Sequence, residues 1–188
     1  MRKLLLIGLA LFGAAAFAAP QPTSELQALD DALPGDLIND PTTLDWNIYG
    51  PGMKRKTVRN ANIPGGGVAL QVTSPASLEP YQVTAEAPIV EGIGKQDKLT
   101  VAFYARTLKA ETVGEQGVVT VRLQQKTSPW PGFGNKTLLI GKDWKLYDMT
   151  ATADIAIPKG DAIVAFQLGG AKQVIEIGQT YVLKMPKK

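Results

Sequence analysis

The side chains that could carry chemistry in this chain are aromatic, amide, hydroxyl and charged groups, because its 188 residues include no His and no Cys. Triads built on His, thiolate or imidazole zinc sites and Cys redox pairs are therefore excluded. A Ser-Lys nucleophile is excluded too, since no serine is followed by Lys three residues later. What remains is chemistry by carboxylates, or binding without reaction.

Carboxylate pairs give no local sign of a hydrolase. Glycoside hydrolysis needs two carboxyl groups about 5–10 Å apart. The nearest local pairs are Asp143 with Asp148 and Asp154 with Asp161, and they fall at predicted strand ends or turns, where acidic residues are commonly solvated. Carboxylates distant in sequence could still meet in the fold, so an enzyme stays an alternative.

Two glycine clusters predict turns rather than phosphate loops. Gly65 to Gly67 follow Pro64 and precede a predicted strand, so no helix N-terminus is offered to a phosphate. The segment 92–95 lacks both the spacing of a P-loop and the strand that precedes one. The sequence therefore does not indicate nucleotide binding.

One aromatic residue stands apart from the rest. Trp130 lies in the segment 128–134, which holds two prolines and two glycines between predicted strands. A rigid, exposed Trp near Phe133 suits stacking on a sugar ring, although Trp130 could equally fold back and close one end of the domain. Four other aromatic residues have apolar strand neighbours and are predicted to be core residues: Trp46, Phe103, Trp144 and Phe166.

Short apolar runs between turn residues must position these side chains. A helix is predicted over 23–33, where Ser24 and Gln27 form a capping box. After it, alternation predicts nine strands and an all-β fold, a two-sheet β-sandwich or jelly roll. The predicted strands are Trp46–Tyr49, Val68–Val72, Tyr81–Ala85, Leu99–Ala105, Val118–Gln125, Lys136–Ile140, Trp144–Thr152, Ala162–Leu168 and Val174–Leu183.

The first residues predict export. Arg2 and Lys3 precede an apolar run, and Ala16 to Ala18 fit the small-x-small pattern at which signal peptidase cleaves. We expect a signal peptide over 1–18, a linker and short helix over 19–35, and one domain over 36–188. The expected location is secreted or periplasmic, with no membrane insertion after cleavage.

The charge balance argues against nucleic acid as a partner. The chain has 20 Lys and Arg against 17 Asp and Glu. Without Arg2 and Lys3 the basic count is 20 minus 2, or 18, so the mature chain is nearly neutral. A nucleic-acid binder normally shows a basic excess that neutralises several phosphates.

An ordered set of short motifs resembles a known group of domains. The motifs are DWNIYG at 45–50, IPGGGVALQV at 63–72, FYAR at 103–106, WKLY at 144–147, FQLG at 166–169 and QVIEIG at 173–178. Together they resemble the carbohydrate-binding modules of families four, nine and twenty-two that are appended to xylanases and cellulases. The resemblance covers about 36–183 and implies a jelly roll whose concave sheet binds a β-glycan.

The resemblance also implies which residues form the cleft. Strands that carry Tyr81, Gln124, Thr137 and Gln167 would make the concave sheet, with Tyr81 as a sugar platform and the loop of Trp130 at the border of the cleft. Simple alternation would turn Tyr81, Val83 and Ala85 to one face, so either a bulge breaks the pattern or the cleft residues are Gln82, Thr84 and Glu86. Tyr104 and Arg106 would lie in the opposite sheet with structural roles.

Calcium is in doubt as a structural ion. Members of the group often end with an Asp that helps to hold calcium, whereas Gln179 and Thr180 occupy that region here. We therefore expect no cofactor.

The sequence thus predicts an exported, non-catalytic domain that binds a polysaccharide or oligosaccharide. Rings would stack on the sugar and polar groups would bond its hydroxyls, through Tyr81, Arg122, Gln124, Trp130, Phe133 and Gln167. Two alternatives remain open: a polysaccharide lyase or hydrolase on the same fold, with Tyr81, Arg122 and Gln124 as candidates, and an envelope scaffold or adaptor that binds a protein partner.

Overall fold

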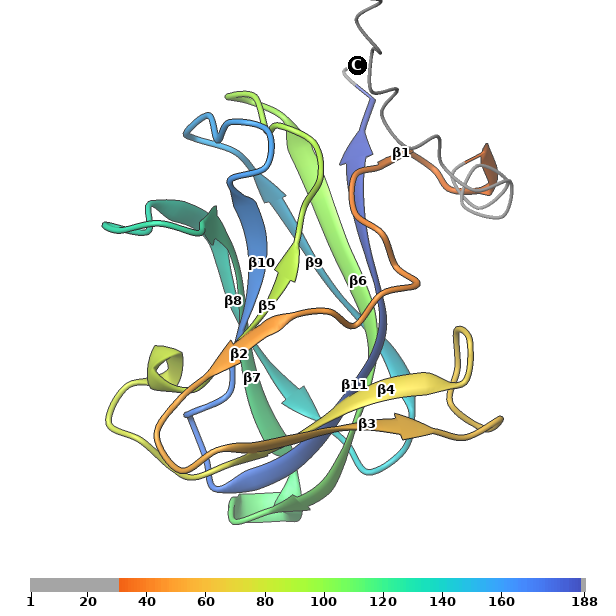
Figure 1. Ribbon diagram of the computed structural model, residues 1–188, viewed down its shortest axis with the longest axis vertical. Helices are drawn as coiled ribbons and strands as arrows, with labels where there is room; N and C mark the ends of the chain where they lie inside the picture. Colours follow the sequence, from red (N-terminus) through yellow and green to blue (C-terminus); the bar gives the residue numbers. More distant parts are fainter. Residues whose placement is uncertain (1–30, 187–188) are drawn as a thin grey trace, which may run out of the picture.

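The computed structural model describes residues 31–186, which form two antiparallel β-sheets that pack face to face (Figure 1). The six-stranded sheet has the order β3-β4-β11-β6-β9, with β1 paired to β11, and the five-stranded sheet has the order β2-β5-β10-β7-β8. The strands are β1 (Asp36–Leu37), β2 (Asn47–Tyr49), β3 (Lys54–Arg59), β4 (Val68–Ser74), β5 (Thr84–Pro88), β6 (Lys98–Ala110), β7 (Gly117–Gln125), β8 (Gly132–Ile140), β9 (Lys145–Thr152), β10 (Ala162–Gln167) and β11 (Gln173–Met185).

The core lies between the sheets and is built by alternation along the strands. In β6, the odd-numbered residues from Leu99 to Thr107 are buried, whereas the even-numbered ones are partly exposed. Three aromatic rings tie the two layers together. Trp46 stacks on Phe166 with ring centroids 5.3 Å apart, and Phe103 meets Phe166 edge-on at 4.9 Å. The predicted all-β sandwich is therefore confirmed.

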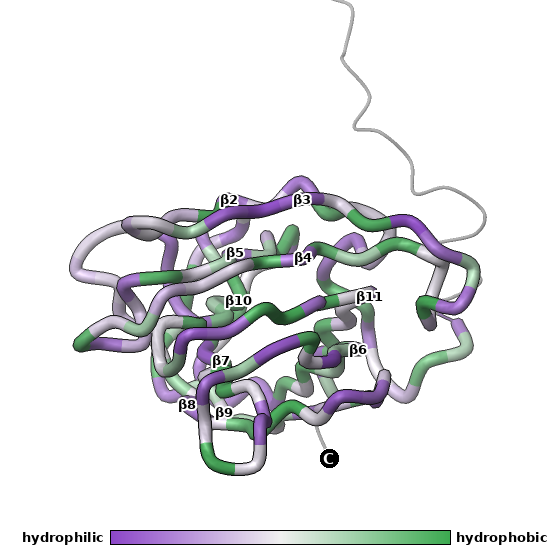
Figure 2. The backbone as a smooth tube through the Cα atoms, turned by 90° about the horizontal axis from the view of Figure 1, so that it is seen from below, coloured by the Kyte–Doolittle hydropathy of each residue, from purple (hydrophilic) through white to green (hydrophobic). Residues whose placement is uncertain are grey.

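Each of the nine predicted strands corresponds to an observed one, but two observed strands were not predicted. β1 has only two residues, too few for a pattern. β3 reads KRKTVR and is almost wholly exposed, so it has no buried face to give alternation, and Figure 2 shows it as a hydrophilic stretch. Charged side chains suit this position, because β3 is an edge strand and charge discourages pairing with other chains.

The predicted strand 81–85 is wrong at its first residues. Pro80, Tyr81 and Gln82 form a 3-10 helix, η1 (Pro80–Gln82), and β5 begins at Thr84. Pro at the first position of η1 favours this helical turn over a strand. Tyr81 is thereby released from the alternation that governs β5.

The prediction of Trp144 as a core residue is also wrong. Trp144 precedes β9 and is partly exposed, and the Arg106 guanidinium lies over its ring, 5.1 Å from the centroid. Arg106 in turn binds the buried Glu176 carboxylate through Nε at 2.7 Å. Trp144 thus covers a charged pair beside the six-stranded sheet, as a cation–π partner.

The predicted helix at 23–33 and the signal peptide lie almost entirely outside the described residues. Within residues 31–186, no helix has the length and apolar character that crossing a bilayer requires.

Candidate ligand-binding pocket

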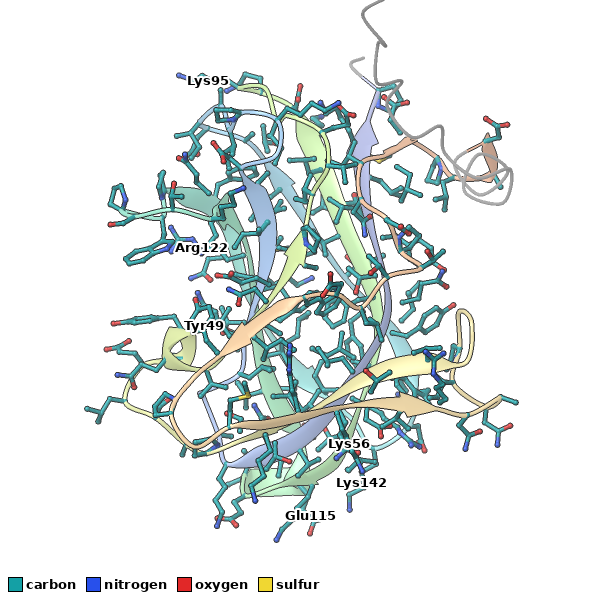
Figure 3. All side chains as sticks on the ribbon, viewed as in Figure 1. Tyr49, Lys56, Lys95, Glu115, Arg122 and Lys142 are labelled. Carbon is teal, nitrogen blue, oxygen red and sulfur yellow. The ribbon has the colours of Figure 1, made fainter. Side chains whose placement is uncertain are left out.

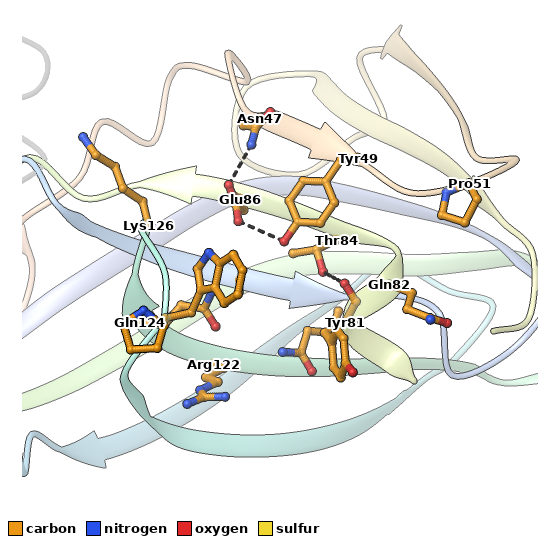
Figure 4. A pocket seen from close by; sticks show the side chains of 14 residues that line it. Asn47, Tyr49, Pro51, Tyr81, Gln82, Thr84, Glu86, Arg122, Gln124 and Lys126 are labelled. Atoms are coloured by element: carbon orange, nitrogen blue, oxygen red, sulfur yellow. Dashed lines mark hydrogen bonds between the residues drawn. The ribbon is translucent and has the colours of Figure 1, made fainter. Parts of the chain in front are cut away.

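A pocket of about 710 Å³ lies on the outer face of the five-stranded sheet (Figure 4). Strands β2, β5, β10 and β7 form its floor, while η1 and the loop before β8 form its walls. Its lining is mixed polar and aromatic: Asn47, Tyr49, Pro51, Tyr81, Gln82, Thr84, Glu86, Arg122, Gln124, Lys126, Pro129, Trp130, Ala165 and Gln167.

Alternation along three neighbouring strands explains why these residues face outward. In β5, Ala85 and Ala87 are buried in the core, so Thr84 and Glu86 turn to the pocket. The same pattern holds in the other two strands. Arg122 and Gln124 alternate with the buried Val121 and Leu123 in β7, and Ala165 and Gln167 alternate with the buried Val164 and Phe166 in β10.

The register places charged groups on both sides of a small residue. Glu86 of β5 pairs with Ala165 of β10, and Ala165 pairs with Arg122 of β7. The three residues therefore form one row across the sheet, with the Ala165 methyl group as its low centre. Asn47 of β2 extends the row beyond Glu86. Figure 3 shows Tyr49 and Arg122 on the same side of the molecule.

Glu86 is held by two neutral donors. Asn47 Nδ2 donates to Glu86 Oε2 at 2.8 Å, and the Tyr49 hydroxyl donates to Oε1 at 3.1 Å. Burial raises the pKa of the Tyr49 phenol; a hydrogen bond with Thr84 lowers it in part, and the neighbouring Glu86 carboxylate raises it further. The phenol therefore keeps the proton with which it donates to Glu86.

Two aromatic rings stand exposed at the walls. The exposed fraction is 51% for Trp130 and 55% for Tyr81. Trp130 has a left-handed backbone with φ of 53°, uncommon for a bulky residue. The backbone N–H of Trp130 donates to the Thr127 carbonyl at 2.8 Å, which closes the turn that carries the ring. The Tyr81 carbonyl accepts a hydrogen bond from Thr84 Oγ1 at 2.8 Å. The backbone of each residue is thus held by a hydrogen bond, and each side chain is exposed.

The amide groups of Gln124 and Gln167 are available to a ligand. Both residues line the pocket, and within residues 31–186 neither side chain makes a hydrogen bond. Each amide offers two donors and an acceptor. The arrangement can therefore bond several hydroxyl groups of one bound molecule.

Five of the six residues selected from the sequence lie around this pocket, namely Tyr81, Arg122, Gln124, Trp130 and Gln167. Phe133 does not, so that prediction is wrong. Phe133 belongs to β8, pairs with Leu123 and is 7% exposed, because alternation turns its ring into the core. The strand was predicted to begin only at Lys136, and this hid the alternation.

The structure also shows which alternate residues around the start of β5 face the pocket. Gln82, Thr84 and Glu86 face the pocket, as one of the two interpretations held, and Tyr81 joins them because η1 interrupts the strand. Asn47 and Tyr49 were not selected from the sequence. Their strand β2 is three residues long with only Ile48 buried, and the pattern Asn-x-Tyr on its outer face was the available signal.

No cluster of three or more potential metal-ligating side chains occurs within residues 31–186. Gln179 Oε1 accepts from the Tyr181 hydroxyl at 2.7 Å, and Thr180 Oγ1 donates to the Gly178 carbonyl at 3.3 Å. The prediction of no cofactor remains a prediction.

Solved structures resemble this fold, whereas no protein-family model and no curated protein matches the chain. The CBM22-1 xylan-binding domain of Xyn10C from Paenibacillus barcinonensis aligns with a TM-score of 0.56 at 12% identity, covering 84% of this chain and 99% of that one. The second N-terminal cellulose-binding domain of β-1,4-glucanase C from Cellulomonas fimi gives 0.53 at 16% identity, covering 82% and 94%.

A CBM4 structure gives a TM-score of 0.52 at 18% identity and covers 62% of this chain and 83% of that one. The chain therefore has the jelly-roll fold of carbohydrate-binding modules, the class that the sequence motifs indicated.

Proposed function

We propose that this protein binds a chain of sugar residues in the pocket on its five-stranded sheet, without catalysing a reaction. The observation that carries the proposal is the placement of two exposed rings, Trp130 and Tyr81, beside the unbonded amides of Gln124 and Gln167. Aromatic faces take the apolar faces of sugar rings, and amides bond hydroxyl groups in both directions. The fold shared with xylan-binding and cellulose-binding domains supports the same ligand class.

The pocket is poorly suited to hydrolysis. A glycosidase needs two carboxyl groups that flank one bond, and Glu86 is the only carboxylate in the lining within residues 31–186. We therefore prefer binding, and incubation of the purified protein with a polysaccharide panel would reveal product release if the preference is wrong.

Export of the protein is part of this proposal. The charged start, apolar run and Ala-rich cleavage pattern over 1–18 support it, and a secreted or periplasmic location would bring the pocket to polysaccharides outside the cell. The mass of the mature chain tests the cleavage site.

Trp130→Ala tests the proposed site most simply, with Trp144→Ala as its matched control. On insoluble polysaccharides such as cellulose and xylan, we expect Trp130→Ala to abolish retention, because a ring that removes about 100 Å² of apolar surface contributes ~2.5 kcal/mol. The melting temperature should change little, since the ring is exposed. Trp144→Ala should keep its retention because Trp144 lies outside the pocket. Unfolding of Trp130→Ala, or full retention by it, would contradict the proposal.

A further inference from the structure

The pocket separates opposite charges along a single row of the sheet. Glu86 and Arg122 flank Ala165 from neighbouring strands and project from the same face. Two strand spacings place the backbones of β5 and β7 about 9–10 Å apart. Figure 4 shows Glu86, with Asn47 and Tyr49, across the pocket from Arg122. A ligand on the Ala165 floor therefore meets a carboxylate on one side and a guanidinium on the other.

Glu86 and Arg122 differ in how many of their hydrogen-bonding positions are used within the protein. Both oxygens of Glu86 accept hydrogen bonds from within the fold. Arg122 has only a long bond of 3.4 Å from Nη2 to the Gly132 carbonyl, and it takes part in none of the ion pairs within residues 31–186. Arginine carries five N–H donors, so most of the bonding capacity of Arg122 is unused.

Lys126, the second cationic residue of the pocket, already has partners within the protein. Lys126 Nζ donates to the Gly160 carbonyl at 2.6 Å and lies 3.5 Å from the Asp161 carboxylate. Arg122 is also less exposed than Lys126, because it stands within the sheet and not at the strand end. Arg122 is therefore a partly buried guanidinium that has no anionic partner within residues 31–186.

We propose that Arg122 binds a carboxylate carried by the glycan, so that the ligand is an acidic polysaccharide with uronate residues. The inference rests on the proposed function and narrows its ligand class. A guanidinium matches a carboxylate with two parallel N–H donors, which neutral hydroxyl groups cannot reproduce. Glu86 would repel a second carboxylate at the opposite side of the row. Glu86 and Arg122 therefore also orient the glycan, with its carboxylate toward β7 and its neutral hydroxyl groups toward β5.

The test compares two probes that differ in one group. The first is a β-linked oligoglucoside that carries one glucuronate residue, and the second is the same molecule with that carboxylate reduced to a hydroxymethyl group. By calorimetric titration at low salt, we expect the full chain to bind the acidic probe about tenfold more tightly, in line with a charge-assisted hydrogen bond. The preference should shrink as salt is added.

Three variants assign the preference to Arg122. Arg122→Gln should bind both probes equally, whereas Arg59→Gln, the same substitution on the exposed edge strand β3, should keep the tenfold preference. Arg122→Lys retains the charge without the paired donors and should keep a smaller preference, which protects the test if Arg122→Gln fails to fold. Equal binding of the two probes by the unmodified protein, or a preference that survives Arg122→Gln, would overturn the inference. Neutral glycans would still be retained in that case if the proposed function holds, and its own failure would appear as no retention on any polysaccharide.

Discussion

At the scale of single residues, Glu86 is a nearly buried hydrogen-bond acceptor in the lining of the pocket. The residue is 8% exposed, and its carboxylate is held by an amide and a phenol instead of a cation. A carboxylate has about four lone-pair sites, and these two bonds use only half of them. Glu86 can therefore still accept hydrogen bonds from ligand hydroxyl groups.

The raised pKa of Tyr49 gives a prediction for alkaline pH. Folding favours the neutral phenol, so its contribution to stability is present below the ordinary pKa of about 10 and is lost as the pH rises through the higher folded pKa. We expect the melting temperature of the unmodified protein to fall more steeply above about pH 10 than that of Tyr49→Phe. Thermal melts across this range check it, and parallel declines in the two proteins would count against a phenol that the folded state keeps neutral.

Two buried glutamines give a matched pair with opposite expectations. Gln167 makes no hydrogen bond within residues 31–186 and faces the pocket, so Gln167→Ala should weaken glycan binding by ~1 kcal/mol and leave the melting temperature unchanged. Gln173 bonds the Val118 backbone in both directions and also donates to the Leu168 carbonyl. Gln173→Ala should therefore destabilise the fold by ~1–3 kcal/mol and spare binding. Titrations and melts measure both, and a loss of stability in Gln167→Ala would show that its amide is structural.

The loop and strand around Trp130 and Phe133 show how far single residues could be predicted. The segment with two prolines and two glycines left two positions open for Trp130, exposed or folded back onto the domain, and the structure has it exposed. The same reasoning failed for Phe133 because β8 begins at Gly132, inside that segment, and strand alternation from there turns the ring inward. Whether a side chain near a strand end faces the core depends on the residue at which strand pairing begins. That residue is set by the partner strand, which can be distant in sequence.

At the scale of elements, strands with a buried face were predictable and the others were not. β10 has six consecutive buried residues, and its apolar side chains gave a clear signal. β1 and β3 gave none, because β1 forms only by pairing with β11 and β3 is a charged edge. The pairing of Glu86 with Asn47 was equally hidden, since the two residues lie 39 positions apart in the sequence.

The link between the segment that follows β1 and strand β11 leads to a prediction about calcium. Asn39 Nδ2 donates to the Thr180 carbonyl at 2.9 Å, and Asn39 Oδ1 accepts from the Val182 N–H at 2.7 Å. This neutral amide holds the segment without a charge that would need a cation. We therefore expect EDTA to leave the melting temperature nearly unchanged. A fall of many degrees that added calcium reverses would show a native-state calcium site that this account lacks.

At the scale of the whole molecule, the two sheets have different roles. The six-stranded sheet and the aromatic core hold the five-stranded sheet in place, and the outer face of that sheet is left with polar side chains and three exposed rings, those of Tyr49, Tyr81 and Trp130. Each of the two wall rings, Tyr81 and Trp130, contributes ~2.5 kcal/mol before the cost of association is subtracted. We expect weak and reversible binding.

Mapping of a bound glycan by nuclear magnetic resonance tests the central claim most directly. When a retained oligosaccharide is titrated into the labelled protein, we predict shifts of the side-chain amides of Gln124 and Gln167 and of the Trp130 indole N–H. The Trp144 indole N–H and the Gln173 amide should not move, because they lie outside the pocket. Shifts centred on Trp144 and the six-stranded sheet would contradict the account.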